Sequence, residues 1–165
     1  MTTSLLHAIT AALLVGSPKA PITPPDPCAL LTKAEAEAII GKTIMPPTVG
    51  GSGECHYGEP GEADEIVVYP MPLGFKTKEE FHAYIVKDTD EMNARMKENL
   101  KNTGAKVKET TVDPVPGVGE AAYYVDPSLI VFRGNRVLNI IAADRKRAVA
   151  VAAKVLPRFA SAAGH

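Results

Sequence analysis

The amino-acid sequence predicts an α+β domain in which a mainly antiparallel sheet is packed by helices. Two segments carry the Thr-x-x-Glu capping box that starts a helix, one at Thr32 and one at Thr77. Short runs rich in β-branched and aromatic residues lie between and after them, and Gly134-Asn135 is a strong two-residue hairpin signal. The predicted order is α-ββ-α-ββββ-α, for which helices against at least one face of an antiparallel sheet are the economical arrangement.

The first helix is expected to begin after Thr32 and to end at Gly41, a natural C-cap. A loop rich in Pro and Gly follows over residues 46–53. Two strands come next, Cys55–Tyr57 and Ile66–Tyr69, and Pro70 is expected to end the second.

The second helix is expected to be the longest, beginning after Thr77. Its apolar residues recur mostly at steps of three and four, as an amphipathic helix requires. These residues are Phe81, Tyr84, Ile85, Met92, Met96 and Leu100. Asp88 falls close to this apolar stripe, which predicts a bend or break near residues 88–90.

The remainder is predicted to be β-rich and to end in a helix. The expected strands are Lys106–Val112, Ala121–Val125, Leu129–Phe132 and Val137–Ala142. Asp144 can cap the last helix, and Pro157 is expected to kink or end it. One face of that helix is apolar, through Ala148, Val151, Ala152 and Val155.

The N-terminus resembles an export signal. Residues 5–16 form an apolar stretch of signal-peptide length that is too short to span a bilayer, although no Lys or Arg precedes it. We expect residues 1–20 to be a signal peptide, cleaved after Ser17 or Ala20, and 21–27 to be a Pro-rich tether. Residues 28–165 then form a single domain. The alternative is an N-terminal core helix.

Cys28 and Cys55 are the only cysteines in the chain. In an exported protein a pair of cysteines is most simply a disulfide, because that compartment lets the bond persist. The alternative is two free buried thiols in a cytosolic protein.

Composition and charge exclude several classes of partner. The formal net charge is −1, so there is no overall attraction to nucleic acid or to anionic lipid. We expect a soluble periplasmic or secreted protein with no membrane span.

The motifs that suggest cofactors or catalysis lack their structural context. Residues 117–122 fit G-x-G-x-x-A, but they follow a Pro-Val-Pro segment and precede a strand, so we interpret them as a turn. No histidine has a second ligand at metal spacing, which argues against a zinc or haem site. The acidic residues between Glu54 and Glu65 are interpreted as a solvated turn. We expect no cofactor.

Basic residues dominate the C-terminal end of the chain. The last helix runs back along the preceding strand, which could bring Arg158 toward Arg133 and Arg136 at the hairpin. These three arginines are the candidate binding site for an anion or an acidic partner. The alternative is a solvated rim that protects the hairpin.

One family resemblance covers most of the chain after residue 25. The segment Asp26-Pro27-Cys28-Ala29-Leu30-Leu31-Thr32, the later Cys55-His56-Tyr57 and the segment 118–122 resemble a family of uncharacterised exported bacterial proteins, many described as lipoproteins. The resemblance implies the disulfide and an α/β sandwich similar to the PsbP-like fold, and it implies no activity. Lipid-anchored members carry a cysteine after the lipobox, where this chain has Ser17, so we do not expect a lipid anchor.

The preferred hypothesis is an exported, non-catalytic binding or interaction module whose partner is a protein or a small anionic ligand. An enzyme with an unrecognised site is the alternative, built from scattered residues such as His56, Tyr57, Tyr123 and Tyr124. An inhibitor or immunity-type protein that binds an acidic partner through its basic end is a third hypothesis.

Overall fold

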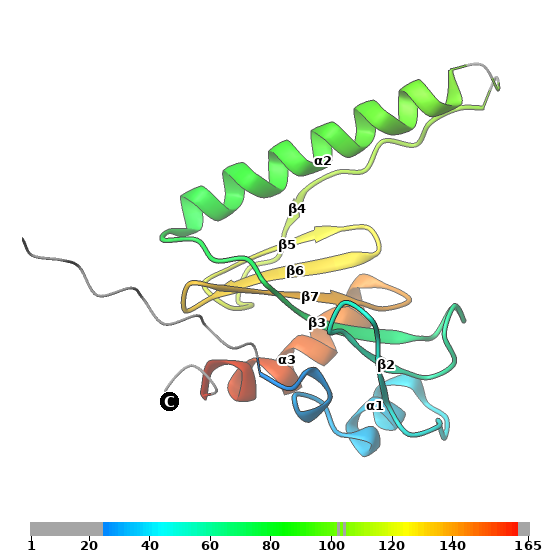
Figure 1. Cartoon of the computed structure of the whole chain (residues 1–165), viewed down its shortest axis with the longest axis vertical. Coiled ribbons are helices and arrows are strands. Elements are labelled where there is room, and N and C mark those ends of the chain that lie inside the picture. The colour runs from blue at the N-terminus through cyan, green and yellow to red at the C-terminus, as the bar shows by residue number, and fades with distance from the viewer. Residues whose placement is uncertain (1–24, 102, 104, 162–165) are drawn as a thin grey trace, which may run out of the picture.

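A computed structural model describes residues 25–101, 103 and 105–161. The predicted signal peptide and residues 21–24 of the predicted tether lie outside the described residues. One antiparallel sheet forms the middle layer (Figure 1). Helix α2 (Lys78–Leu100) lies on one side of it, and helices α1 (Lys33–Ile40) and α3 (Arg145–Ser161) lie on the other. The predicted α+β class is confirmed, and the order of elements is close to the predicted one.

The N-terminal part begins with a 3-10 helix, η1 (Pro27–Ala29), and helix α1 (Lys33–Ile40). Asp26 and Pro27, which the sequence placed in the tether, form the N-cap and the first residue of η1. The predicted capping box of α1 is complete. The Glu35 amide donates to Thr32 Oγ1 at 3.2 Å, and the Thr32 amide donates to Glu35 Oε2 at 2.9 Å. Gly41 ends the helix in the left-handed conformation, with φ of 88°.

The sheet contains seven strands in the order β1-β2-β3-β7-β6-β5-β4, and every neighbouring pair is antiparallel. The strands are β1 (Thr48–Val49), β2 (Cys55–Tyr57), β3 (Ile66–Met71), β4 (Asp113–Pro114), β5 (Ala121–Val125), β6 (Ser128–Arg133) and β7 (Arg136–Ile141). The predicted hairpin turn joins β6 to β7. Gly134 and Asn135 both have positive φ, 58° and 65°, as a type I′ turn requires.

The two faces of the sheet support two separate hydrophobic clusters. The larger cluster lies between the sheet and α1 and α3 (Arg145–Ser161), and it includes Leu138, Ile140 and Val151. The smaller lies under α2 (Lys78–Leu100) and is centred on Phe81 and Phe132. Successive residues of β7 therefore point alternately to the α3 side and the α2 side.

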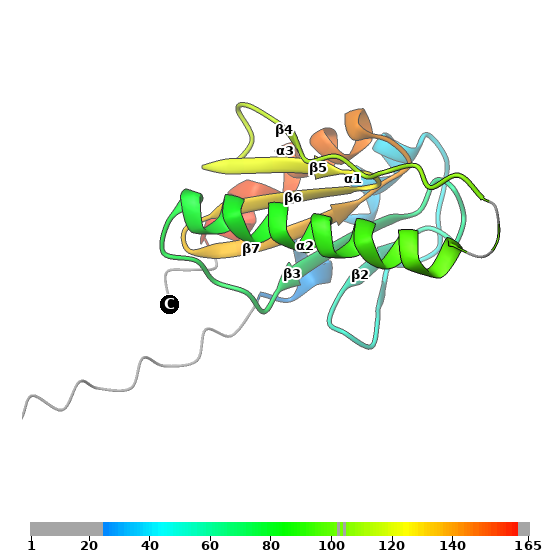
Figure 2. The same cartoon turned by 90° about the horizontal axis from the view of Figure 1, so that it is seen from above.

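Two expectations about α2 and the segment that follows it were wrong. The helix runs unbroken through residues 88–90, and residues 106–112 form no strand. That segment returns alongside α2 (Figures 1 and 2). Asn93 holds this segment there, because its Nδ2 donates to the Thr110 carbonyl at 2.9 Å and its Oδ1 accepts from the Thr110 amide at 2.9 Å. At Asn93 the contacts of the helix are therefore polar, and they are made with the segment that follows the helix.

The interpretation of residues 117–122 as a turn is confirmed, because they connect β4 to β5 with no helix after the glycines. Gly119 has φ of 62°, and a Cβ atom there would lie 2.6 Å from Val131 Cγ1 and 2.8 Å from the Phe132 carbonyl oxygen. The glycine is needed for this close approach to β6.

Neither Pro70 nor Pro157 ends its element, although Pro70 was expected to end its strand and Pro157 to kink or end its helix. Strand β3 continues through Pro70 to Met71. Strand β2 pairs with β3 only as far as Val68, so no strand on that side requires the N–H that Pro70 lacks. Helix α3 does not end at Pro157 but continues to Ser161. Asp144 caps this helix as predicted, with Oδ1 accepting from the Arg147 amide at 2.8 Å.

Candidate functional site

The predicted disulfide between Cys28 and Cys55 is confirmed. It joins η1 to β2, which are adjacent on the α3 side of the sheet. Tyr57, two residues further along β2, reinforces the same junction because its hydroxyl donates to the Leu31 carbonyl at 2.7 Å. Cys55 and Tyr57 are both fully buried, so the two cysteines act as a structural cross-link.

The residues named for an unrecognised enzyme site do not come together. Burial of Tyr57 raises the pKa of its hydroxyl to about 12, which keeps it protonated. Tyr123 belongs to the cluster under α2, whereas Tyr124 packs on the α3 side and donates to Asp126 Oδ1 at 3.2 Å. His56 lies on β2, away from both tyrosines, which are on β5 near the other edge of the sheet.

His56 is instead held between two carboxylates. Its Nδ1 lies 2.6 Å from Glu65 Oε1, and its Nε2 lies 3.3 Å from Glu54 Oε1. The hydrogen bond to Glu65 raises the pKa of His56 above its ordinary value, and Glu54 adds to this against the effect of burial. These three side chains tie the loop before β2 to the start of β3, so the acidic stretch is partly a set of structural contacts and not only a solvated turn.

The three candidate arginines lie in three different environments. Arg133 is exposed at the end of β6, directly opposite Arg136 in the register of the hairpin. Arg158 does not join them, because it makes a bidentate ion pair with Glu35, with nitrogen–oxygen distances of 2.8 and 2.9 Å. Its Nη1 also donates to the Leu30 carbonyl at 2.9 Å. Arg158 is thus a structural link between α3 and α1.

Arg136 is the unusual residue of the three. Only 7% of its surface is exposed, and neither Nη1 nor Nη2 has a hydrogen-bond partner among the described residues. Its Cζ lies 4.2 Å from the centroid of the Phe159 ring. Burial lowers the pKa of the guanidinium, but an arginine remains charged at neutral pH. A buried cation with two free donors is costly unless an anion or water satisfies it.

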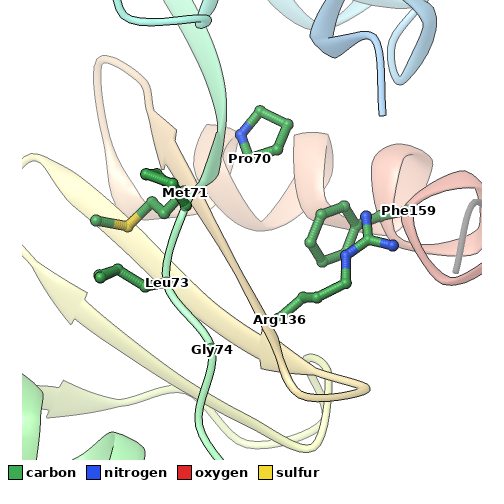
Figure 3. A pocket seen from close by; sticks show the side chains of 7 residues that line it. Pro70, Met71, Leu73, Gly74, Arg136 and Phe159 are labelled. Carbon is green, nitrogen blue, oxygen red and sulfur yellow. The ribbon is translucent and has the colours of Figure 1, made fainter. Parts of the chain in front are cut away.

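A pocket of about 250 Å³ lies beside this guanidinium. It is lined by residues 70–74, Arg136 and Phe159. Figure 3 shows the side chains of Pro70, Arg136 and Phe159 on one side of the β3 chain, while Met71 and Leu73 point to the other. The apolar surfaces on the same side as the cation are therefore the rings of Pro70 and Phe159.

The fold positions each of these groups. Arg136 is the first residue of β7, and its side chain points to the α3 side in alternation with Val137. Pro70 lies near the end of β3, opposite Leu138. Phe159 reaches the pocket only because α3 continues beyond Pro157.

Sequence reasoning selected Arg136 but missed Phe159 and residues 70–74. A signal for Phe159 was present, because the apolar series of α3 continues from Val155 by one more step of four. Nothing in the spacing of Pro70, Pro72 and Gly74 indicates that this segment faces the start of β7.

No protein-family model, curated protein or solved structure matches this chain. The resemblance to exported lipoprotein-like proteins, and to the PsbP-like fold, stays a prediction.

Two further structural findings apply to the described residues alone. In residues 25–101, 103 and 105–161, no group of three or more His, Cys, Asp or Glu side chains is arranged to hold a metal ion. Across the same ranges, none of the helices combines the length and the apolar character that crossing a membrane would require.

Proposed function

We propose that this protein is an exported, non-catalytic binding module that takes a small anionic ligand in the Arg136 pocket. The observation that carries the proposal is the buried guanidinium whose two terminal nitrogens have no partner among the described residues. An arginine in this state is a preformed donor site for an anion. The folded protein already holds the charge in a buried position, and an anion would accept the hydrogen bonds that the two nitrogens lack.

The pocket favours binding over chemistry. The described residues that line it are Pro, Met, Leu, Gly and Phe around one arginine, and this part of the lining includes no nucleophile and no side chain that titrates near neutral pH. Apolar walls with one precisely placed polar group are typical of small-molecule sites.

Export is the second part of the proposal. The apolar stretch at residues 5–16 and the Pro-rich segment after it support it, and the Cys28–Cys55 disulfide is consistent with an oxidising compartment. The serine at position 17 favours a form without a lipid anchor.

The proposal is tested by screening simple anions for stabilisation of the purified protein. Carboxylates, alkyl phosphates and alkyl sulfonates are each added at up to 10 mM, on the order of ten times a Kd of about 1 mM. At that ratio a ligand specific for the folded state adds roughly 1.4 kcal/mol and raises the Tm measurably. We expect at least one class to raise the Tm of the wild type.

Two arginine variants locate the effect. Arg136→Met should abolish the stabilisation, because it removes both donors and keeps much of the apolar bulk. Arg133→Met is the matched control, since it removes the same charge from the exposed opposite position of the hairpin, and it should keep the response. Equal responses in the two variants, or no response to any class in the wild type, would contradict the proposed function.

A further inference from the structure

The Arg136 pocket contains enough detail to narrow the class of its ligand, an inference that rests on the proposed function. The relevant features are the number of charges in the pocket, the way Phe159 covers the guanidinium, and the size and polarity of the remaining space. Each selects a different property of the ligand.

The charge in the pocket selects a monoanion. Among residues 25–101, 103 and 105–161, Arg136 is the only charged residue that lines it, since Arg158 is paired with Glu35 and Arg133 is exposed outside the lining. A single negative charge would be neutralised by this guanidinium. A phosphate monoester, close to a dianion at neutral pH, would leave an uncompensated negative charge beside apolar walls, which is costly.

The position of Phe159 selects the direction of approach. Its ring covers one face of the guanidinium, with 4.2 Å between Cζ and the ring centroid. The unpartnered Nη1 and Nη2 lie along the edge of the guanidinium plane and are both buried, so an anion reaches them only when a lining side chain moves aside. Two adjacent donors in one plane match the two oxygens of a carboxylate, which binds arginine in a planar bidentate pair.

The rest of the pocket selects an apolar body of limited size. The volume of about 250 Å³ corresponds to roughly eight water molecules at ~30 Å³ each. This is below the usual range for drug-sized ligands, so a group of about eight non-hydrogen atoms is the right scale. The rings of Pro70 and Phe159 would contact carbon atoms and offer no polar partner.

We propose that the Arg136 pocket binds small monocarboxylates that carry a short apolar chain or ring, with the carboxylate on the Nη1–Nη2 edge of Arg136 and the apolar body against Pro70 and Phe159.

Four probes that differ in charge, anion or apolar body test this class by titration calorimetry on the wild-type protein. Hexanoate carries both features, hexan-1-ol lacks the charge, acetate lacks the body, and hexyl phosphate replaces the carboxylate with a larger anion of higher charge. Hexanoate should bind with a Kd on the order of 0.1–1 mM, as expected for a ligand of this size. It should bind at least tenfold more tightly than each of the other three probes.

Two variants connect the preference to the proposed contacts. Arg136→Lys keeps a positive charge but loses the planar pair of donors, and it should weaken hexanoate at least fivefold while hexan-1-ol, which has no carboxylate, changes little. Phe159→Leu should weaken hexanoate and leave Arg136 in place. Circular dichroism and the Tm establish that each variant is folded, and the four-probe series on the wild type requires no variant.

The outcomes separate the ligand class from the proposed function. Tighter binding of hexyl phosphate than of hexanoate, lost in Arg136→Met, would overturn the monocarboxylate class and leave the anion-binding function standing. Equal binding of hexan-1-ol and hexanoate would overturn the role of the carboxylate. Binding of an acidic synthetic peptide, with no binding of hexanoate, would overturn the small-molecule class in favour of a protein partner. Failure of every anion, peptide included, would overturn both proposals.

Discussion

At the scale of single residues, the three candidate arginines have different roles because their neighbours in the fold differ. Arg158 pairs with a carboxylate from α1, whereas Arg136 lies against an aromatic ring and beside a pocket. Composition and spacing indicated that Arg133, Arg136 and Arg158 could share one end of the domain, but they could not indicate that Glu35 would pair with Arg158. That pairing depends on α1 and α3 packing together, which is a tertiary result.

Glu35 therefore has two structural roles, in the capping box of α1 and in the ion pair with Arg158. The hydrogen bonds from Arg158 lower the pKa of its carboxyl from 4.5 to about 2, and the Thr32 contacts add to this against burial. At about 1.4 kcal/mol per pKa unit the full shift would be worth roughly 3 kcal/mol. Solvent reduces this, since the Arg158 side chain is 41% exposed, so we expect about 1–2 kcal/mol.

Glu35→Gln tests how much this carboxylate contributes to stability. A lowered carboxyl pKa stabilises the fold fully above its unfolded value near 4.5 and loses that contribution as the pH falls through about 2. The variant should lose about 1–2 kcal/mol of unfolding free energy at pH 7. The difference from the wild type should be roughly halved or smaller at pH 3. Urea titrations at pH 7, 4.5 and 3 measure this.

The matched control for Glu35→Gln is Glu79→Gln, in the first turn of α2, where the Glu79 side chain is 72% exposed. It should change the unfolding free energy by less than about 0.5 kcal/mol at every pH. A Glu35→Gln deficit that is the same at pH 3 as at pH 7 would show that the carboxylate charge does not contribute.

At the scale of elements, local signals predicted where helices begin and which strands form the central hairpin. The Thr32 box, the Gly41 cap and the Gly134-Asn135 turn act through neighbours in the chain, so sequence alone is sufficient to identify them. Residues 106–112 show the limit of this reasoning. Their alternating pattern correctly indicates extended backbone, but it cannot indicate whether that backbone pairs with a strand or with a helix side chain.

The second prediction concerns this contact between α2 and the extended segment. Asn93→Ala should leave the Thr110 amide and carbonyl without their partners, at a cost of about 1–2 kcal/mol. Hydrogen exchange at the Thr110 amide should become at least about tenfold faster, since 1.4 kcal/mol corresponds to a factor of ten. Asn93→Asp, which keeps an acceptor for the amide, should preserve more of the protection.

Lys87→Gln is the control for the Asn93 variants, because Lys87 lies on the same helix and its ion pair with Glu91 stays within that helix. Its effect on Thr110 exchange should be small. If exchange at Thr110 is unchanged in Asn93→Ala, other contacts hold the segment along α2.

At the scale of the whole molecule, the candidate site exists only because three distant segments meet. The end of β3, the start of β7 and the last turns of α3 surround the pocket. More than 50 residues of chain separate Gly74, after β3, from Arg136, at the start of β7. Sequence reasoning selected Arg136 for its charge. It could not assign burial to that arginine, because an arginine at a hairpin is usually exposed and only the packing of α3 covers it.

The last prediction concerns the compartment and the cross-link together. Protein purified from its native host should have lost its first 17 or 20 residues and should carry no lipid. Reduction of the unfolded protein should add two hydrogens. The physical reason is that Cys55 is fully buried and the bond closes a loop with a sequence separation of 27, so a protein oxidised during export would keep it. Intact mass spectrometry before and after reduction measures all three.

A paired variant gives the energetic counterpart of that measurement. Cys28→Ser with Cys55→Ser should lower the unfolding free energy by about 3–4 kcal/mol in the chain-entropy view of a loop this long. The same double variant compared with reduced wild type separates the cross-link from the burial of serine, because only the variant places a hydroxyl at the fully buried position 55. Two free thiols in native-host protein that still carries its first 20 residues would contradict export. The disulfide holds η1 beside β2, where Cys55 pairs with Val68 of β3, and neither cysteine lines the Arg136 pocket at residues 70–74. Loss of the bond should therefore lower stability while hexanoate binding persists under conditions where the variant is folded.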